Sequence, residues 1–231
     1  MPPMHSLLIV YNTRRLNAGI IPRILRANGL QYSVVSKQEF LDAHPALIPS
    51  GIILLGGFQT LANNQDRELW RVVQKTERLI RDGRSIFGIC LGAQILAKIH
   101  GASVVRHPAG VREIGYHAVL KSTPFTDSYI PEGLYYHWHY DIIEGLPQKH
   151  VVLRSAFTPI QAFKIGRHFG IQFHPEITTA TLREWLTIGA HRLSDPGAQA
   201  ASDQIHAHRD HAIQNATRLK VAVARWSSLQ R

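Results

Sequence analysis

The chain has 231 residues, 45% of them hydrophobic, which is enough for one α/β domain with a full core. Its single cysteine excludes an intrachain disulfide, no apolar stretch is long enough to span a membrane, and Met1–His5 do not resemble a signal peptide, so we expect a cytoplasmic protein. The formal net charge is +10, but the basic residues are scattered and accompany no nucleic-acid motif, so nucleic-acid binding is not indicated.

The first half of the chain alternates strands and helices. Apolar runs predict strands at 6–11, 32–35, 51–55 and 85–87, and periodic apolar residues predict helices at 20–28, 65–82 and 93–100. The run at 51–55 is apolar throughout, as expected for a strand that is buried on both faces of a parallel sheet. The alternation predicts an α/β fold: a doubly wound, mostly parallel sheet with helices on both faces.

The second half changes to short alternating strands, which predict a small antiparallel region between Ser103 and Phe173. These strands are expected at 115–121, 134–138, 151–156, 161–165 and 168–173. Helices are predicted at 179–193 and 202–229, with an apolar stripe on the last one formed by Ile205, Ala212, Ile213, Ala216, Leu219, Val223 and Trp226. We therefore divide the chain into a domain over residues 1–194 and a C-terminal helical extension over 195–231 that packs on it.

The only cysteine, Cys90, lies in Gly88-Ile89-Cys90-Leu91-Gly92, between a predicted strand and a predicted helix. This is the thiol form of the G-x-S-x-G pattern, which holds a nucleophile at a sharp strand-to-helix turn. Small flanking residues are needed where helix and strand cross, and the positive end of the helix dipole favours a thiolate. A buried structural cysteine is the weaker alternative.

A candidate base follows the last predicted strand, in Gly170-Ile171-Gln172-Phe173-His174-Pro175-Glu176. In extended backbone, His174 and Glu176 point to the same side, so the carboxylate can orient the imidazole toward a thiol. The spacing alone fits equally well a histidine in a strand-end turn beside a solvated glutamate. Only the combination with Cys90 favours a catalytic pair.

Together these motifs give the chain a family resemblance. It resembles the class I glutamine amidotransferases, above all the glutaminase domain of GMP synthase and its stand-alone relatives. The motifs that carry the resemblance lie at 51–57, at 88–94 and at 161–163 followed by 170–176. The match covers residues 5–190 and implies a flavodoxin-like fold.

The resemblance also implies roles for individual residues. Cys90 would be the nucleophile, His174 the base and Glu176 its orienting group. The amides of Gly57 and Leu91 would form the oxyanion hole, and Gly56 and Gln94 would contact the substrate. The implied reaction hydrolyses a γ-carboxamide through a γ-glutamyl thioester and releases ammonia and glutamate.

Two positions depart from the family pattern. Phe58 follows Gly56-Gly57, where the family often has proline, so the oxyanion loop is expected to be less preorganised. In Tyr136-His137-Trp138-His139-Tyr140-Asp141, Tyr140 replaces the glycine of a Ser-His-Gly-Asp pattern that contacts substrate. We therefore count His139, Tyr140 and Asp141 as candidate substrate-binding residues. Ordinary packing of an aromatic cluster explains the segment equally well.

Neither a cofactor nor a metal is expected. His206, His208 and His211 do not bring three good ligands to one point of the final helix. The sequence has no P-loop and no ATP-pyrophosphatase motif, so ammonia would pass to a separate synthase subunit. The alternatives are a γ-glutamyl hydrolase or peptidase that acts on γ-glutamyl amines or peptides, and a catalytically silent regulatory subunit. No membrane partner is expected, and a homo-oligomer is left open.

Overall fold

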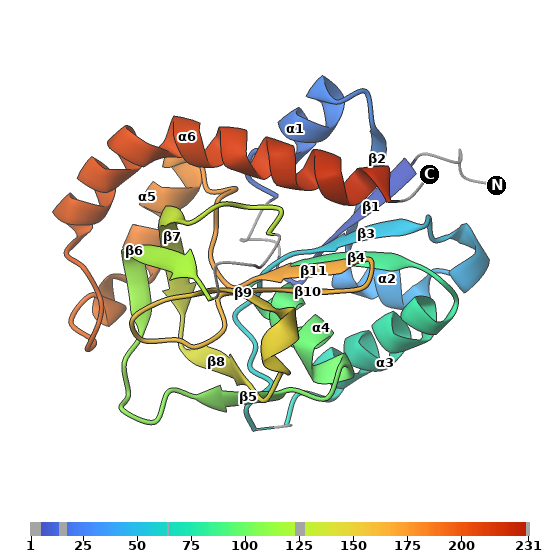
Figure 1. Ribbon diagram of the computed structural model, residues 1–231, viewed down its shortest axis with the longest axis horizontal. Helices are drawn as coiled ribbons and strands as arrows, with labels where there is room; N and C mark the ends of the chain where they lie inside the picture. Colours follow the sequence, from blue (N-terminus) through green and yellow to red (C-terminus); the bar gives the residue numbers. More distant parts are fainter. Residues whose placement is uncertain (1–5, 14–17, 64, 123–127, 230–231) are drawn as a thin grey trace.

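A computed structural model describes residues 6–13, 18–63, 65–122 and 128–229. Met1–His5, on which the reading of the N-terminus rests, lie outside the described residues. The described strands form a nine-stranded sheet in the order β2-β1-β3-β4-β11-β10-β9-β6-β7 (Figure 1). Two further strands, β5 and β8, pair in a small sheet of their own.

The first five strands of this order are parallel. They are β2 (Gln31–Ser36), β1 (Ser6–Tyr11), β3 (Gly51–Leu54), β4 (Ser85–Ile89) and β11 (His168–Ile171). All residues of β3 and β4 are buried, as the continuous apolar runs predicted. The predicted α/β fold with its parallel central sheet is therefore confirmed.

The antiparallel strands extend the same sheet beyond β11. They are β10 (Ala162–Ile165), β9 (Val151–Arg154), β6 (Glu113–Lys121) and β7 (Gly133–His139). The separate pair, which the strand predictions did not include, consists of β5 (Ser103–Arg106) and β8 (Asp141–Glu144). This pairing brings Arg106 opposite Asp141.

Helices cover both faces of the sheet. They are α1 (Ile21–Ala27), α2 (Lys37–Asp42), α3 (Arg67–Arg81), α4 (Leu91–Ile99), α5 (Thr179–Ile188) and α6 (Ala201–Ser228). One core cluster joins α1 to the last turns of α6, and a second joins α2, α3 and α4. The sequence prediction missed α2, although Ser36 and Glu39 form a capping box at its start.

Helix α5 is shorter than predicted. It ends at Ile188, and a 3₁₀ turn at Ala190–Arg192 follows. Gly189 lies between them, against the Trp138 ring, where an added Cβ would overlap the indole. This break turns His191 and Arg192 toward the pocket described below.

The apolar stripe predicted for α6 is fully buried only in the C-terminal half of the helix. Leu219, Val223 and Trp226 are buried, whereas Ile213 is 82% exposed. The buried positions of the first half are polar instead, and each finds a partner: Gln204 with Tyr136, His208 with Tyr116 and Asn215 with the Leu134 carbonyl. Apolar periodicity could not reveal a helix face that packs through hydrogen bonds.

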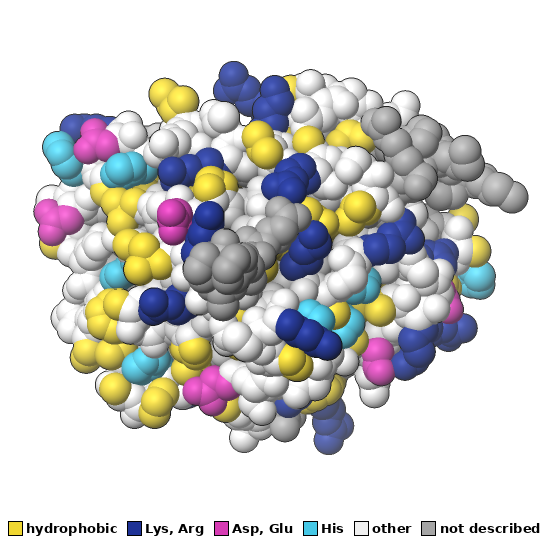
Figure 2. Space-filling model, in the orientation of Figure 1, with side chains coloured by type: hydrophobic (Ala, Val, Ile, Leu, Met, Phe, Trp, Pro, Cys, Tyr) yellow, Lys and Arg dark blue, Asp and Glu magenta, His cyan; other side chains and the backbone are white. Residues whose placement is uncertain are grey.

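The surface carries its basic residues in a dispersed way. Figure 2 shows Lys and Arg side chains spread over the visible face, with uncharged side chains between them. In the ranges that the structure describes, no helix is both long and apolar enough to cross a membrane.

Candidate active site

Cys90 occupies the sharp turn between β4 and α4. Its φ of 52° and ψ of −110° make it the only non-glycine residue with a positive φ in the described part of the chain. Its amide donates to the Ile171 carbonyl at 2.8 Å, and its side chain is buried. A strained backbone held this firmly is typical of a functional residue.

The two glycines of the turn allow helix and strand to cross closely. A Cβ on Gly88 would lie 2.5 Å from the Gly92 carbonyl oxygen, and a Cβ on Gly92 would overlap the Leu54 carbonyl. Both neighbours are backbone atoms, which cannot rotate away as a side chain can. The need for small residues inferred from the motif thus has a direct steric cause.

Gly92→Ala is expected to destabilise the fold by about 3 kcal/mol, because the added methyl group overlaps the backbone of β3. Urea denaturation measures the change. Gly166→Ala is the control: its Cβ would meet nothing within 4 Å, although its φ is +55°. The control should cost about 1 kcal/mol, from backbone strain alone. Equal costs for the two variants would contradict the steric account.

His174 lies beyond β11 and is held between a carboxylate and a thiol. Its Nδ1 is 2.6 Å from Glu176 Oε1, and the Cys90 thiol lies near enough to act on the pKa of the ring. Burial disfavours the charged ring, but the Glu176 carboxylate and the Cys90 thiol outweigh burial and raise the pKa of His174 to about 10. The ring can therefore carry a proton at neutral pH.

Four neighbours fix the orientation of His174 and Glu176. The His174 amide donates to the Tyr136 carbonyl of β7 at 2.7 Å, and the Trp185 ring packs edge-on against the imidazole at 4.9 Å between centroids. The Ile20 amide donates to the Glu176 carbonyl at 3.0 Å. Gly19, with φ +53°, passes so close that an added Cβ would overlap that carbonyl.

The loop after β3 brings Gly56 and Gly57 to the elbow. A Cβ on Gly56 would lie 3.2 Å from His174 Cε1 and 3.5 Å from Cys90 Cβ, so Gly56 adjoins both residues. A Cβ on Gly57 would lie 2.6 Å from Leu91 Cδ2. Leu91 is the first residue of α4, so its amide has no acceptor within the helix. The two residues predicted to form the oxyanion hole thus lie side by side.

A cavity of about 230 Å³ opens beside the elbow. Of the predicted site residues, its lining includes Gly57, Cys90, Leu91, Gln94, His139, Tyr140, Asp141 and His174. Gly56 and Glu176 do not line it. The remaining lining residues were not among the predicted site residues: Phe58, Gln59, Thr60, Arg106, Trp138, Trp185, Ile188, Gly189, His191 and Arg192.

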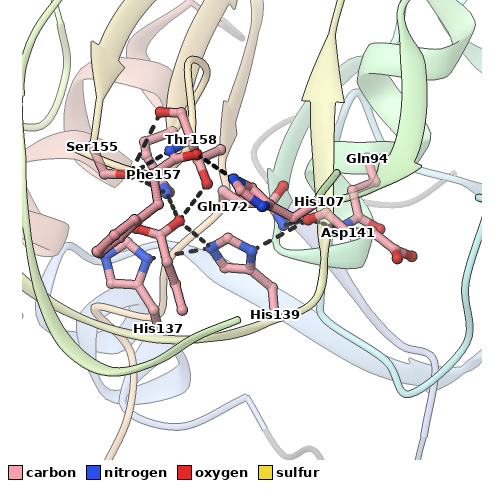
Figure 3. A network of polar contacts seen from close by, with 11 residues as sticks. Gln94, His107, His137, His139, Asp141, Ser155, Phe157, Thr158 and Gln172 are labelled. Atoms are coloured by element: carbon pink, nitrogen blue, oxygen red, sulfur yellow. Dashed lines mark hydrogen bonds and ion pairs between the residues drawn. The ribbon is translucent and has the colours of Figure 1, made fainter. Parts of the chain in front are cut away.

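Several side chains of the site donate hydrogen bonds to the backbone carbonyl of Asp141 (Figure 3). It accepts hydrogen bonds from His139 Nδ1 at 3.2 Å, Gln172 Nε2 at 3.3 Å and Gln94 Nε2 at 3.5 Å. Gln94 Nε2 and His139 Nδ1 therefore stabilise the backbone at Asp141 and are not free to bind a ligand in the cavity.

The Asp141 side chain is also engaged. It accepts a hydrogen bond from Thr60 and forms an ion pair with Arg106 at 3.1 Å. Burial raises the pKa of Asp141, against the opposing effects of Thr60 and Arg106. The sequence had no local signal for either residue, because Thr60 reaches the site from the loop after β3 and Arg106 from the end of β5.

A buried cluster of Glu113, His137 and His139 could hold a metal ion, since their ligand atoms lie within 4.8 Å of one another. The Glu113 carboxylate already accepts hydrogen bonds from Thr158 and Gln161 and lies 3.4 Å from His139 Nε2. Burial lowers the pKa of His139 to about 4 and that of His137 well below its usual value, so both rings are neutral. Both hydrogen bonds reach Oε2 of the carboxylate, whereas its Oε1 is buried without a partner among the described residues. The absence of a metal stays a prediction.

Comparison with known proteins finds relatives that all hydrolyse glutamine according to their names or family. The model of the family "Glutamine amidotransferase class-I" matches residues 14–187. GMP synthase [glutamine-hydrolyzing] of Aeropyrum pernix is 30% identical over 198 residues, which are 78% of this chain and 36% of that protein. A GMP synthase [glutamine-hydrolyzing] subunit from Pyrococcus furiosus is 31% identical over 163 residues, which are 67% of this chain and 81% of the relative. The chain thus spans well under half of the first relative.

Solved structures with a similar fold cover nearly the whole chain. A glutamine amidotransferase from Thermotoga maritima has a TM-score of 0.83 at 23% identity and covers 97% of this chain and 99% of its own. A glutamine amidotransferase from Methylobacillus flagellatus has a TM-score of 0.85 at 22% identity, with coverages of 97% and 94%. At these identities the likeness concerns the fold.

Proposed function

Because the chain belongs to the class I glutamine amidotransferase family, we propose that it hydrolyses the γ-carboxamide of glutamine through a γ-glutamyl thioester on Cys90. The observation that carries this proposal is the chain of contacts from Cys90 to His174 to Glu176. A thiol at a helix N-terminus, beside an imidazole that a carboxylate orients, supports nucleophilic catalysis.

In the first half of the reaction, the Cys90 sulfur attacks the γ-carbonyl carbon and a carbon–sulfur bond forms. The carbonyl oxygen takes up negative charge, and the amides of Gly57 and Leu91 stabilise it. The close approach of these two residues supports this role. His174 donates its proton to the departing nitrogen as the carbon–nitrogen bond breaks, and ammonia leaves. Until this transfer, Glu176 stabilises the protonated ring.

In the second half, water attacks the thioester. His174, now neutral, accepts a proton from the water as the new carbon–oxygen bond forms. The carbon–sulfur bond breaks, glutamate leaves and Cys90 is regenerated. None of these steps calls for a metal or an organic cofactor.

The decisive experiment incubates the pure protein with glutamine and with a panel of γ-glutamyl amines and dipeptides, and measures ammonia, amine and glutamate. Release of equal amounts of glutamate and ammonia from glutamine supports the proposal. Release from none of these compounds, by protein that is shown to be folded, would favour the silent regulatory subunit.

The ammonia that is released can also pass to another protein instead of to the solution. The relative from Pyrococcus furiosus is named as one subunit of its synthase, and we propose that this chain likewise supplies ammonia to a separate synthase subunit. The panel assay repeated with a co-purified partner should then give faster glutamine hydrolysis than the chain alone.

A γ-glutamyl hydrolase is the second candidate function, and the position of Tyr140 favours it. The phenol lines the cavity where the family pattern has glycine, so it reduces the space near the backbone. Tyr140→Gly is expected to shift the ratio of kcat/KM toward glutamine, relative to a γ-glutamyl amine, by about tenfold. A ratio that stays within about threefold would remove this support.

A further inference from the structure

The mouth of the cavity contains an arginine whose charge is not balanced. Among the described residues, Arg106 and Arg192 both line it, together with a single carboxylate, that of Asp141. Arg106 is paired with Asp141 at 3.1 Å. Across the ranges that the structure describes, Arg192 forms no ion pair and its side chain donates no hydrogen bond. A fixed positive charge is therefore available at the mouth.

Tyr140 holds this arginine in place. Three guanidinium groups lie around its ring, with Arg112 at 4.8 Å, Arg192 at 5.3 Å and Arg106 at 5.6 Å from the centroid. Arg112 is paired with Asp195, and the Tyr140 hydroxyl accepts a hydrogen bond from Trp138 Nε1 at 3.2 Å. A cation–π contact positions a guanidinium without using its N–H donors.

The walls around this charge are largely apolar. Trp138 and Trp185 line the cavity, and Phe58 and Ile188 are 58% and 38% exposed at its edge. The planar fork of a guanidinium matches a carboxylate, which it can bind through two parallel hydrogen bonds. The mouth thus complements a short carbon chain that ends in a carboxylate.

We propose that Arg192, held against Tyr140, binds a carboxylate of the substrate at the mouth of the cavity. This rests on the proposed function, because it concerns the substrate of the same site. The carboxylate has two sources: the α-carboxylate of the glutamyl group, or a carboxylate on the amine of a γ-glutamyl amino acid. Because Phe58 and Ile188 extend the site outward from the buried Cys90, the amine is the favoured source.

The test measures binding by titration calorimetry in the Cys90→Ala background, so that turnover does not interfere. One matched pair is γ-glutamylglycine and γ-glutamylglycinamide, which differ only in the carboxylate of the amine. The other pair is glutamine and its α-amide, which differ only in the α-carboxylate. Arg192→Gln is compared with Arg183→Gln, which removes the same charge from an exposed site on α5 outside the cavity.

Arg192→Gln is expected to raise the Kd of γ-glutamylglycine about tenfold or more and to change the Kd of γ-glutamylglycinamide by less than about threefold. Arg183→Gln should change neither. Tyr140→Leu should reproduce the selective loss because it removes the aromatic face, and Tyr140→Phe should retain tight binding because it keeps that face.

Each other outcome has a definite reading. Selective weakening of glutamine against its α-amide, with no effect specific to γ-glutamylglycine, supports the carboxylate site and assigns it to the glutamyl group. No selective loss in either pair overturns the proposal. If the wild type hydrolyses no γ-glutamyl compound while Arg192→Gln still gives the selective loss, the proposed function fails and the carboxylate site stands.

Discussion

Replacing Cys90 by alanine is expected to lower kcat for glutamine hydrolysis by about four orders of magnitude or more, because no other nucleophile can form the thioester. Cys90→Ser should be almost as inactive, since a hydroxyl is a far weaker nucleophile than a thiolate. Both side chains are no larger than the thiol, so the strained turn keeps its packing. Ammonia release measures the activity, and thermal unfolding checks that the variants are folded.

A second measurement makes this prediction more specific. A glutamine-derived chloroketone should add once to the wild type and not at all to Cys90→Ala, as mass spectrometry would detect. Because Cys90 is the only cysteine of the chain, the labelled site is unambiguous. Substantial activity in the alanine variant would rule out Cys90 as the nucleophile.

His174→Ala is expected to be nearly as damaging as the loss of Cys90, because members of a triad act as a unit. Glu176→Gln should cost less in rate but should change the pH profile. The Glu176 carboxylate helps to raise the pKa of His174 to about 10, and the reaction uses protonated His174 as the acid. Activity should therefore fall as the pH rises through this value, and in Glu176→Gln the fall should begin at lower pH.

The control for this shift is the acid limb of kcat/KM, where His174 is already protonated and the Glu176→Gln variant should follow the wild type more closely. An alkaline limb that is the same in both proteins would show that Glu176 does not support the charge on His174.

The same contact links stability to pH. The folded pKa of His174, about 10, lies above the unfolded value of 6.5. The stabilisation is therefore complete below about pH 6.5 and is lost as the pH rises toward 10. In urea unfolding, the free energy of unfolding of the wild type should fall between these two pH values. The fall should be smaller in Glu176→Gln.

The parts of the site that the sequence predicted are formed by residues that lie close together in the chain. The elbow of Cys90 lies within five residues, and its strand-to-helix pattern indicated the orientation of the thiol. The His174–Glu176 pair spans three residues and was indicated only together with Cys90. Its two side chains do meet, although Pro175 and Glu176 form a turn rather than the extended backbone expected. The central parallel strands were predictable for a related reason, since burial on both faces leaves a continuous apolar run.

The parts that could not be predicted depend on contacts between distant segments. Thr60, Arg106 and Arg192 meet at the cavity from three distant segments of the chain, and none stands in a distinctive pattern. Arg106 arrives through the β5–β8 pair, which has too few residues for a clear alternation. On α6, His208 takes an inward position because Tyr116 offers its hydroxyl, which no property of the helix alone could indicate.

The solitary thiol of Cys90 also sets how the protein would respond to oxidants. A sulfenic acid formed there has no second thiol in the chain with which to close a protective disulfide. Recovery would depend on a small external thiol that enters the same cavity as the substrate, where only 6% of Cys90 is exposed. A bound substrate would thus shield the sulfur from peroxide, while an empty site would leave it open to irreversible oxidation.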